Sequence, residues 1–290
     1  MKHFLSISLL TIFATGCSAS SKTSSNDSAD EAFDNSDPDE PGSTPDPDET
    51  PSDDVQAEVL FEVRGGAYDI TLAPDGRVFV SIQEHGITVW DPVTDYPETY
   101  TERAGAVFGI AWADDTIMYT TSLHRQEGTL SRLDGTRGTV IAQASGSTIF
   151  REPTDLVQAA DGAWVLSDRT LGTLFVVRDD GEDVTMLDVD LDKPSCLAAD
   201  DDYVYAGGLD GVVRIPWPDG TPETIDERPV NGLHIVEGDL LGSNVDWGIF
   251  RVGENERLGF DDVALPGRIE GDTRVYVTDW DGSEVWASLP

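Results

Sequence analysis

Five side chains that could hold a metal ion stand at the openings of apolar segments recurring along residues 56–290. They are Asp69, Asp155, Asn231, Asp261 and Asp262. Carboxylate and amide oxygens are the ligands that a hard divalent cation such as Ca²⁺ prefers. If the segments converge, the sequence predicts a divalent-cation site. The alternative is that these side chains cap strand starts by accepting hydrogen bonds from backbone N–H groups.

A second polar set lies at the ends of later apolar segments. Asp168, Asn244 and Asp279 each follow a Ser or Thr in the pairs 167–168, 243–244 and 278–279, while Tyr68 directly precedes Asp69. We consider these four as candidate ligand-binding residues. For the three that follow Ser or Thr, a structural role is the alternative, because Asp and Asn side chains commonly bond the turn after a strand.

Other catalytic chemistries have no signature in the sequence. It contains no Gly-x-Ser-x-Gly elbow, no phosphate-binding Gly loop, no His-Glu-x-x-His and no dinucleotide fingerprint. Two cysteines and four histidines exclude a disulfide framework and thiolate-rich zinc or iron–sulfur sites. No catalytic residue is therefore assigned, and the pattern favours binding over catalysis.

The charge excludes another class of partner. Acidic residues outnumber basic ones by 56 to 18, for a net charge of −38. A surface this negative repels phosphate backbones, so we expect no nucleic-acid partner.

The elements that must position these side chains are strands of a repeat. Six copies of a strand–turn–strand unit follow one another at a spacing of about 40 residues, the length of a four-stranded propeller blade. Their openings fall at 68–72, 108–112, 154–157, 195–198, 231–234 and 261–264. The sequence therefore predicts an all-β, six-bladed β-propeller over 56–290.

One strand is left over at each end of the repeat. The last copy ends at its third strand, residues 284–289, and residues 58–63 form an apolar strand ahead of the first copy. We predict that this N-terminal strand completes the last blade and closes the ring, which removes two exposed strand edges. A β-sandwich or solenoid is the alternative fold.

With these openings, among them 153–156 and 229–233, the domain resembles the six-bladed propellers of the NHL, YncE-like and SMP-30/gluconolactonase group. In SMP-30-type lactonases a metal is held by Glu, Asn and Asp at blade openings. By resemblance Asn231 would match that Asn and Asp261 that Asp, whereas Tyr68 stands where the family has Glu. The resemblance implies a metal-dependent lactonase as the alternative function, with Asp155 or Asp262 as its base.

The N-terminal segment predicts where the protein is located. Residues 1–17 combine Lys2, an apolar stretch and a small-residue exit before Cys17, as in a secretory signal. The exit resembles the lipobox of bacterial lipoproteins, which implies lipidation of Cys17 and, with Ser18 next, the outer membrane of a Gram-negative bacterium. Ordinary signal cleavage is the alternative.

Residues 18–55 are Ser, Asp, Pro, Glu and Thr with almost no apolar side chain, so we predict a disordered tether. The resulting hypothesis is a monomeric, surface-tethered propeller that binds a protein, glycan or small molecule at its channel mouth.

Overall fold

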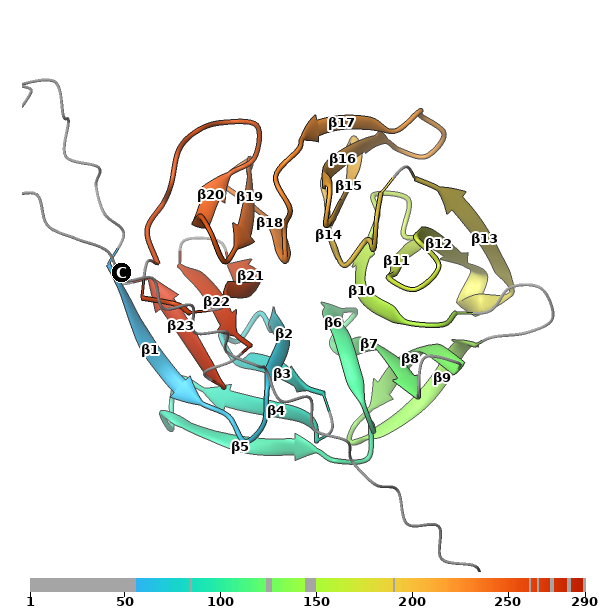
Figure 1. Ribbon diagram of the computed structural model, residues 1–290. Helices are drawn as coiled ribbons and strands as arrows, with labels where there is room; N and C mark the ends of the chain where they lie inside the picture. Colours follow the sequence, from blue (N-terminus) through green and yellow to red (C-terminus); the bar gives the residue numbers. More distant parts are fainter. Residues whose placement is uncertain are drawn as a thin grey trace, which may run out of the picture. The chain divides into compact units, whose positions relative to one another are not determined.

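The structure is a computed structural model that describes a ring of β-sheets. The described residues are 56–83, 85–123, 127–143, 150–189, 191–260, 262–264, 266–271, 274–280 and 283–288. The chain divides into two units, Met1–Thr50 and Pro51–Pro290, and every described residue belongs to the second. Within that unit six antiparallel sheets surround a central channel (Figure 1).

The strands follow the predicted repeat. Blade one contains β2 (Ala67–Leu72), β3 (Val78–Ile82), β4 (Gly86–Asp91) and β5 (Tyr96–Thr101), and blade two β6 (Val107–Ala113), β7 (Thr116–Leu123), β8 (Glu127–Asp134) and β9 (Arg137–Gln143). Blade three contains β10 (Pro153–Gln158), β11 (Trp164–Asp168), β12 (Thr173–Arg178) and β13 (Asp183–Asp188), and blade four β14 (Cys196–Ala199), β15 (Tyr203–Gly208), β16 (Gly211–Pro216) and β17 (Glu223–Asp226). Blade five contains β18 (Gly232–Val236), β19 (Asp239–Asn244) and β20 (Gly248–Arg251), and blade six β21 (Pro266–Gly271), β22 (Val275–Asp279) and β23 (Glu284–Ser288). In the described ranges the single helical element is the 3₁₀ turn η1 (Asp179–Gly181), and no helix is long and apolar enough to cross a bilayer.

The predicted ring closure is confirmed. Strand β1 (Ala57–Glu62) pairs antiparallel with β23, so the first strand of the domain completes the last blade. Phe61 of β1 is buried and stacks on Trp90 of blade one, with ring centroids 6.0 Å apart. The six-bladed, all-β prediction therefore holds, and neither a sandwich nor a solenoid fits this topology.

Tight Asp-Gly turns connect the first two strands of blades one and three. Gly76 and Gly162 have φ values of +85° and +84°, a conformation that glycine adopts without steric cost. In both turns the preceding carboxylate, Asp75 or Asp161, accepts a hydrogen bond from the backbone N–H two residues later. The local sequence thus sets the hairpin that carries each inner strand.

The sixth inner strand differs from the expectation. The repeat placed its opening at residues 261–264, but β21 begins at Pro266. Asp262 is exposed in a turn, and Val263 is buried in the core beside Ile269. The predicted start of this strand was wrong because Asp262 and Val263 repeat the polar–aliphatic pattern of the other openings, but Val263 packs in the core without joining the sheet.

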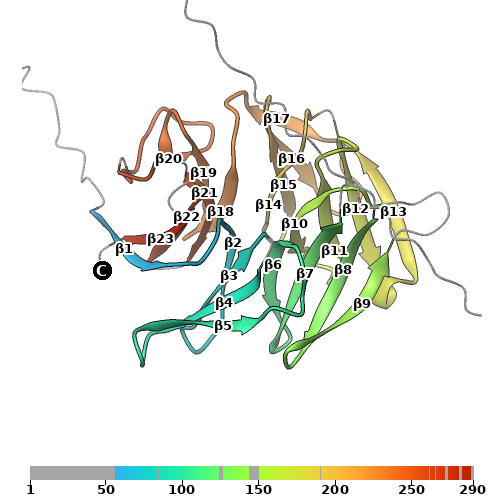
Figure 2. The same ribbon diagram turned by 60° about the horizontal axis from the view of Figure 1, so that its bottom comes forward.

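The inner strands β2, β6, β10, β14, β18 and β21 line the channel and run in the same direction. Asp69 accepts the N–H of Ile110, and Thr71 accepts that of Trp112 two residues further along both strands. We call the end where these strands begin the start face, and the end that carries their first hairpin turns the hairpin face. Figure 2 shows the same ring from another angle.

Candidate functional site

One level of the channel is formed by a ring of equivalent residues, one from each inner strand. In five blades the backbone N–H or Cα of this residue lies opposite a Ser or Thr on the second strand, as for Asp69 with Ser81 and for Gly232 with Ser243. The ring reads Asp69, Gly109, Asp155, Cys196, Gly232 and Arg268. Two carboxylates, one guanidinium and three small residues therefore meet at the centre of the domain.

Arg268 reaches across the channel from blade six. Its Nε lies 3.7 Å from Asp69 Oδ1 and 3.8 Å from Asp155 Oδ2. Its terminal nitrogens donate to backbone carbonyls of three other blades, those of Thr154, Ser195 and Asn231. With 2% of its surface exposed, Arg268 joins five blades through one side chain. We refer to Arg268, Asp69 and Asp155 as the arginine cluster.

The two carboxylates of the cluster also serve neighbouring backbone groups. Asp69 accepts the N–H groups of Ile70 and Ile110 at 2.8 Å, and Asp155 those of Leu156 and Leu197 at 2.7 Å. Burial raises the pKa of both carboxyls, the second carboxylate raises that of Asp69 further, and Arg268 opposes both shifts. Burial alone would lower the pKa of Arg268, but the two aspartates outweigh it and raise that pKa, so the guanidinium stays charged.

Two glycines of the ring make room for this arrangement. A Cβ on Gly109 would lie 2.6 Å from the Cα of Asp155, and one on Gly232 would lie 2.9 Å from the Cα of Arg268. Contacts this short are not tolerated by a backbone neighbour. The ring therefore needs small residues between its charged ones.

The structure brings together two of the five predicted metal ligands. Asp69 and Asp155 meet, with the Arg268 guanidinium between them. Asn231 lies beside them, but its side-chain amide donates to Pro266 O at 3.3 Å. Asp262 is exposed away from the ring, and Asp261 lies outside the described residues. Among the residues that the structure describes, no group of three His, Cys, Asp or Glu side chains could hold a metal ion.

The Asp and Asn residues that follow Ser or Thr bond to backbone turns. Asp168 accepts the N–H groups of Arg151, Glu152 and Leu171. Asn244 accepts those of Asp246 and Trp247 and donates to Pro229 O, while Asp279 accepts that of Ala264. The geometry matches the turn-bonding alternative for all three.

Tyr68, the fourth candidate ligand-binding residue, belongs to an aromatic layer beside the arginine cluster. Its ring stacks on Trp280 with centroids 5.6 Å apart and meets the edge of Phe108 at 5.0 Å. Arg268 Cζ lies 5.6 Å from the centroid of the Tyr68 ring, in cation–π range. Burial raises the pKa of the Tyr68 phenol to about 12, so it is neutral at physiological pH.

A pocket of about 290 Å³ lies in the channel, reaching from the arginine cluster toward the hairpin face. We call it the channel pocket. Its wall consists mostly of the later residues of the inner strands. Its polar side chains beyond the cluster are those of Thr71, Gln158, His234 and Glu270. Trp112 and Trp164 supply aromatic surface. The sequence placed the site at the openings of the inner strands, whereas this cavity lies toward their ends.

Glu270 and His234 form a close pair in the channel pocket. Oε2 of Glu270 lies 3.6 Å from Nδ1 of His234, and the opposite ring nitrogen contacts Gly271 O at 2.7 Å. Burial raises the pKa of Glu270 to about 8, with a further contribution from Asp155, although 27% of its side chain remains exposed. Burial also lowers the pKa of His234. At neutral pH this is a carboxylic acid beside a neutral imidazole rather than an ion pair.

Sequence reasoning missed both Arg268 and Glu270 because the sixth inner strand was placed too early. A usable signal exists, since the hydroxyl residue of the second strand follows its ring residue by 12 positions for Asp69, 11 for Gly109 and 10 for Arg268. Counting back from Thr278 would have found Arg268.

Comparison with known proteins supports the fold. No protein-family model matches the chain, and no curated protein matches its sequence. Among solved structures, a gluconolactonase from Xanthomonas campestris matches with a TM-score of 0.70 and 16% identity, over 82% of this chain and 91% of that one. A PQQ-bound aldose sugar dehydrogenase from Streptomyces coelicolor matches at 0.61, with 14% identity over 80% and 97%. A virginiamycin B lyase from Staphylococcus aureus, solved with quinupristin, matches at 0.58, with 13% identity over 81% and 99%.

The chain therefore shares the architecture of gluconolactonase-like six-bladed propellers, as its repeats had indicated. At these identities the likeness concerns the fold. The chemistry has to be argued from the side chains of this chain.

Proposed function

We propose that this protein is a binding propeller that takes a small, polar, uncharged ligand in the channel pocket. The observation that carries the proposal is the pocket itself, a polar cavity of about 290 Å³ beside a fully engaged arginine cluster. Small-molecule sites are concave and combine apolar walls with a few placed polar groups. Trp112 and Trp164 supply the apolar surface, and Glu270, His234 and Gln158 the polar groups.

The charges around the pocket favour an uncharged ligand. The positive charge of Arg268 is already opposed by Asp69 and Asp155, and Glu270 is held largely protonated at pH 7. A ligand with a full charge would enter without a free counter-charge, which is costly in a recessed site. Hydroxyl and amide groups can instead bond the carboxylic acid and the imidazole.

The proposal includes the cellular localisation of the protein. Lipidation of Cys17 at the lipobox-like exit would anchor the chain to a membrane, and residues 18–55 would act as a spacer. The binding domain would then work outside the cytoplasm at the outer membrane.

Hydrolysis of a lactone or ester is the second candidate, favoured by the Glu270–His234 pair. A neutral imidazole can take a proton from water as the water oxygen attacks the carbonyl, and a neutral carboxylic acid can protonate the leaving oxygen. The gluconolactonase from Xanthomonas campestris shows that the fold can carry such chemistry. The Arg268 guanidinium lies between Asp69 and Asp155. A hydrolase that uses the Glu270–His234 pair therefore needs no metal ion at that position.

One experiment separates the two functions. Gluconolactone, gluconate and glucose are titrated calorimetrically into the full chain and into Glu270→Gln, His234→Gln and the exposed blade-four control Glu223→Gln. Lactone hydrolysis is followed in parallel, with and without a chelator. Binding that weakens in the two channel variants and persists in the control supports the binding function.

Turnover that disappears in Glu270→Gln and resists the chelator would favour the hydrolase instead. Turnover abolished by the chelator would favour the metal-dependent lactonase that the family resemblance implied. If none of the three compounds binds or reacts, the proposal of a sugar-sized polar ligand is wrong.

A further inference from the structure

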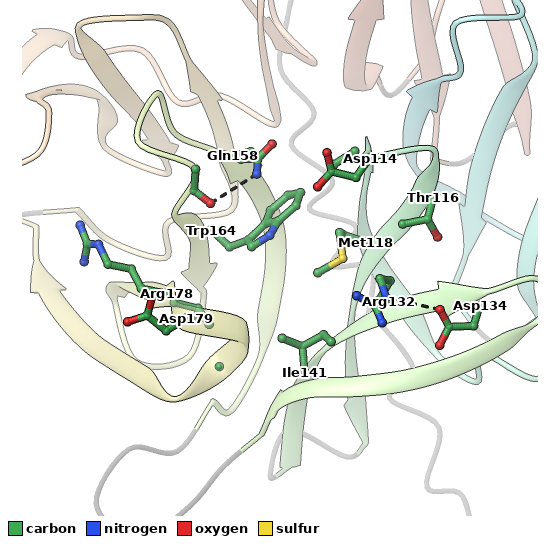
Figure 3. A pocket seen from close by; sticks show the side chains of 14 residues that line it. Asp114, Thr116, Met118, Arg132, Asp134, Ile141, Gln158, Trp164, Arg178 and Asp179 are labelled. Atoms are coloured by element: carbon green, nitrogen blue, oxygen red, sulfur yellow. Dashed lines mark hydrogen bonds and ion pairs between the residues drawn. The ribbon is translucent and has the colours of Figure 1, made fainter.

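A second cavity lies between blades two and three, outside the channel. It has a volume of about 560 Å³, within the range of small-molecule sites, and we call it the blade groove. Blade two contributes residues of β6 to β9, and blade three residues of β10 to β12 and η1 (Figure 3). The groove lies near the hairpin face, because the turn residues Asp114 and Gly162 line it.

Two close backbone approaches link blades two and three. Toward the axis, Gly109 meets Asp155, where a Cβ would lie 2.6 Å from Cα. Near the periphery, Gly181 meets Ile141, where a Cβ would lie 2.1 Å from the carbonyl oxygen. Because both contacts depend on glycine, the spacing of the two blades is set by backbone packing. The cavity between them is therefore a fixed feature of the fold.

The walls of the blade groove combine an aromatic surface with planar polar groups. Figure 3 shows the indole of Trp164 pointing into the cavity near Met118 and Arg132, whereas the guanidinium of Arg178 points away from the cavity. Arg132 is oriented by the Asp134 carboxylate at 3.3 Å, whereas Arg178 pairs with Asp161 and lies over the ring of Trp217, directly after β16 of blade four. Ion pairs of this kind hold a guanidinium in place while its remaining N–H groups face outward.

The charge of the groove is mixed. Its lining includes two arginines and three aspartates, Asp114, Asp134 and Asp179. An anionic ligand would meet these carboxylates and the negative field of the whole protein, and a cationic one would meet the Arg132 guanidinium. A neutral ligand with many hydroxyl groups meets neither obstacle, since hydroxyls donate to carboxylates and accept from guanidiniums.

We propose that the blade groove binds a neutral saccharide chain, with one sugar ring stacked on Trp164 and its hydroxyls bonded by Arg132. The apolar C–H face of a sugar fits an aromatic ring, and its edge carries the hydroxyls that the polar groups need. Trp164 and Gln158 line both the groove and the channel pocket, so the two cavities adjoin. The saccharide site does not depend on the ligand proposed for the channel.

The test uses the full chain and neutral cello-, malto- and chito-oligosaccharides of roughly two to six units, titrated at low and high NaCl concentration. The variants are Trp164→Leu, which keeps an apolar side chain, and Arg132→Ala, which changes no residue of the channel pocket. Arg214→Ala is the matched control, because Arg214 pairs with Glu223 at 2.8 Å on blade four. Circular dichroism and melting verify that each variant is folded.

We expect at least one neutral series to bind. Its affinity should fall about tenfold or more in Trp164→Leu and several-fold in Arg132→Ala. Arg214→Ala and Glu270→Gln should bind like the parent, and salt should change the affinity less than about twofold.

Three results would overturn the proposal. One is that no neutral series binds the parent. Another is binding that Trp164→Leu and Arg132→Ala leave unchanged, or that Glu270→Gln abolishes, which would move the saccharide to the channel. The third is binding of uronate chains or peptides only, with loss at high salt.

Discussion

Arg268 places a full positive charge in the middle of a β-propeller, where water is largely excluded. Taking an ion out of water costs several kcal/mol, and the cost is recovered only when every partner is in place. Here two carboxylates and three carbonyls from other blades provide those partners. Nε makes no hydrogen bond and faces the two carboxylates at ion-pair distance, so the cluster depends on charge as well as on hydrogen bonds.

Replacing Arg268 with Met should destabilise the domain strongly. Asp69 and Asp155 would remain buried without their counter-charge, and breaking a buried pair in this way costs about 3–5 kcal/mol. Urea unfolding followed by tryptophan fluorescence measures the change. The triple variant Asp69→Asn, Asp155→Asn, Arg268→Met should regain part of the loss, because it leaves no unpaired charge. If Arg268→Met alone is as stable as the parent, the charge of Arg268 does not stabilise the arginine cluster.

Glu270 predicts a pH dependence of stability. Its pKa is raised from 4.5 to about 8 in the folded chain. Between these values the folded state keeps a proton that the unfolded state has released, so the contribution of this group falls as pH rises from about 4.5 to about 8. Glu270→Gln removes the titration and should raise the free energy of unfolding at pH 9 by on the order of 2 kcal/mol relative to the parent, with partial exposure limiting the gain.

The comparison requires unfolding curves of parent and variant at about pH 5 and pH 9, each variant set against Glu223→Gln. Equal differences at both pH values would mean that Glu270 has an ordinary pKa.

At the scale of the elements, β1 carries the closure of the ring. It supplies the fourth strand of blade six, and Phe61 fills the seam between that blade and blade one. Val59, which points the other way, is 40% exposed. The strand therefore contributes through its backbone pairing and a few buried side chains. The ion pair of Glu58 with Arg274 at 3.1 Å is exposed and adds little.

Deleting residues 56–65 should destabilise the whole domain. The deletion uncovers the edge of β23 and removes a buried aromatic side chain worth about 1.5–3 kcal/mol, in addition to the lost sheet hydrogen bonds. Because a domain is stable by only about 5–15 kcal/mol, we expect aggregation or a large drop in melting temperature. Deleting ten residues within 20–54 is the matched control and should leave the melting temperature unchanged. Parent-like melting of the first deletion would show that blade six is stable with three strands.

At the scale of the whole molecule, the sequence combines an acidic domain with an N-terminal segment of different composition. Of the charged residues, 44 acidic and 16 basic ones lie in residues 56–290, so the acidity belongs to the domain as well as to the predicted tether. A net charge this far from zero favours solubility and discourages association with anionic surfaces. An acyl anchor would hold such a domain near a membrane that its own surface does not attract.

Cys17→Ser should release the protein from membranes. The thioether that carries the lipid cannot form on a serine, and the remaining N-terminal sequence offers only a short apolar stretch. Fractionation of expressing cells, with metabolic labelling by a fatty acid, measures both localisation and modification. A cleaved Cys17→Ser protein that still sediments with membranes would contradict lipid anchoring.

The sequence alone determined the architecture, since the periodic signals are local. Acidic or Gly turns, apolar strand segments and the regular spacing specify each blade, and the unpaired strands at residues 58–63 and 284–289 specify the closure. The one wrong boundary lies in blade six, where an apolar Val263 imitates a strand start.

The tertiary structure alone decided what the inner-strand residues do. Asp69 and Asp155 were recognised as oxygen donors at the channel, but the sequence does not show that Arg268, more than a hundred residues from Asp155, would lie between them. Electrostatic partners depend on distances in space, and a propeller joins its first and last blades. The pKa of Glu270 and the two cavities have the same origin, because burial and empty volume arise only when all six blades pack together.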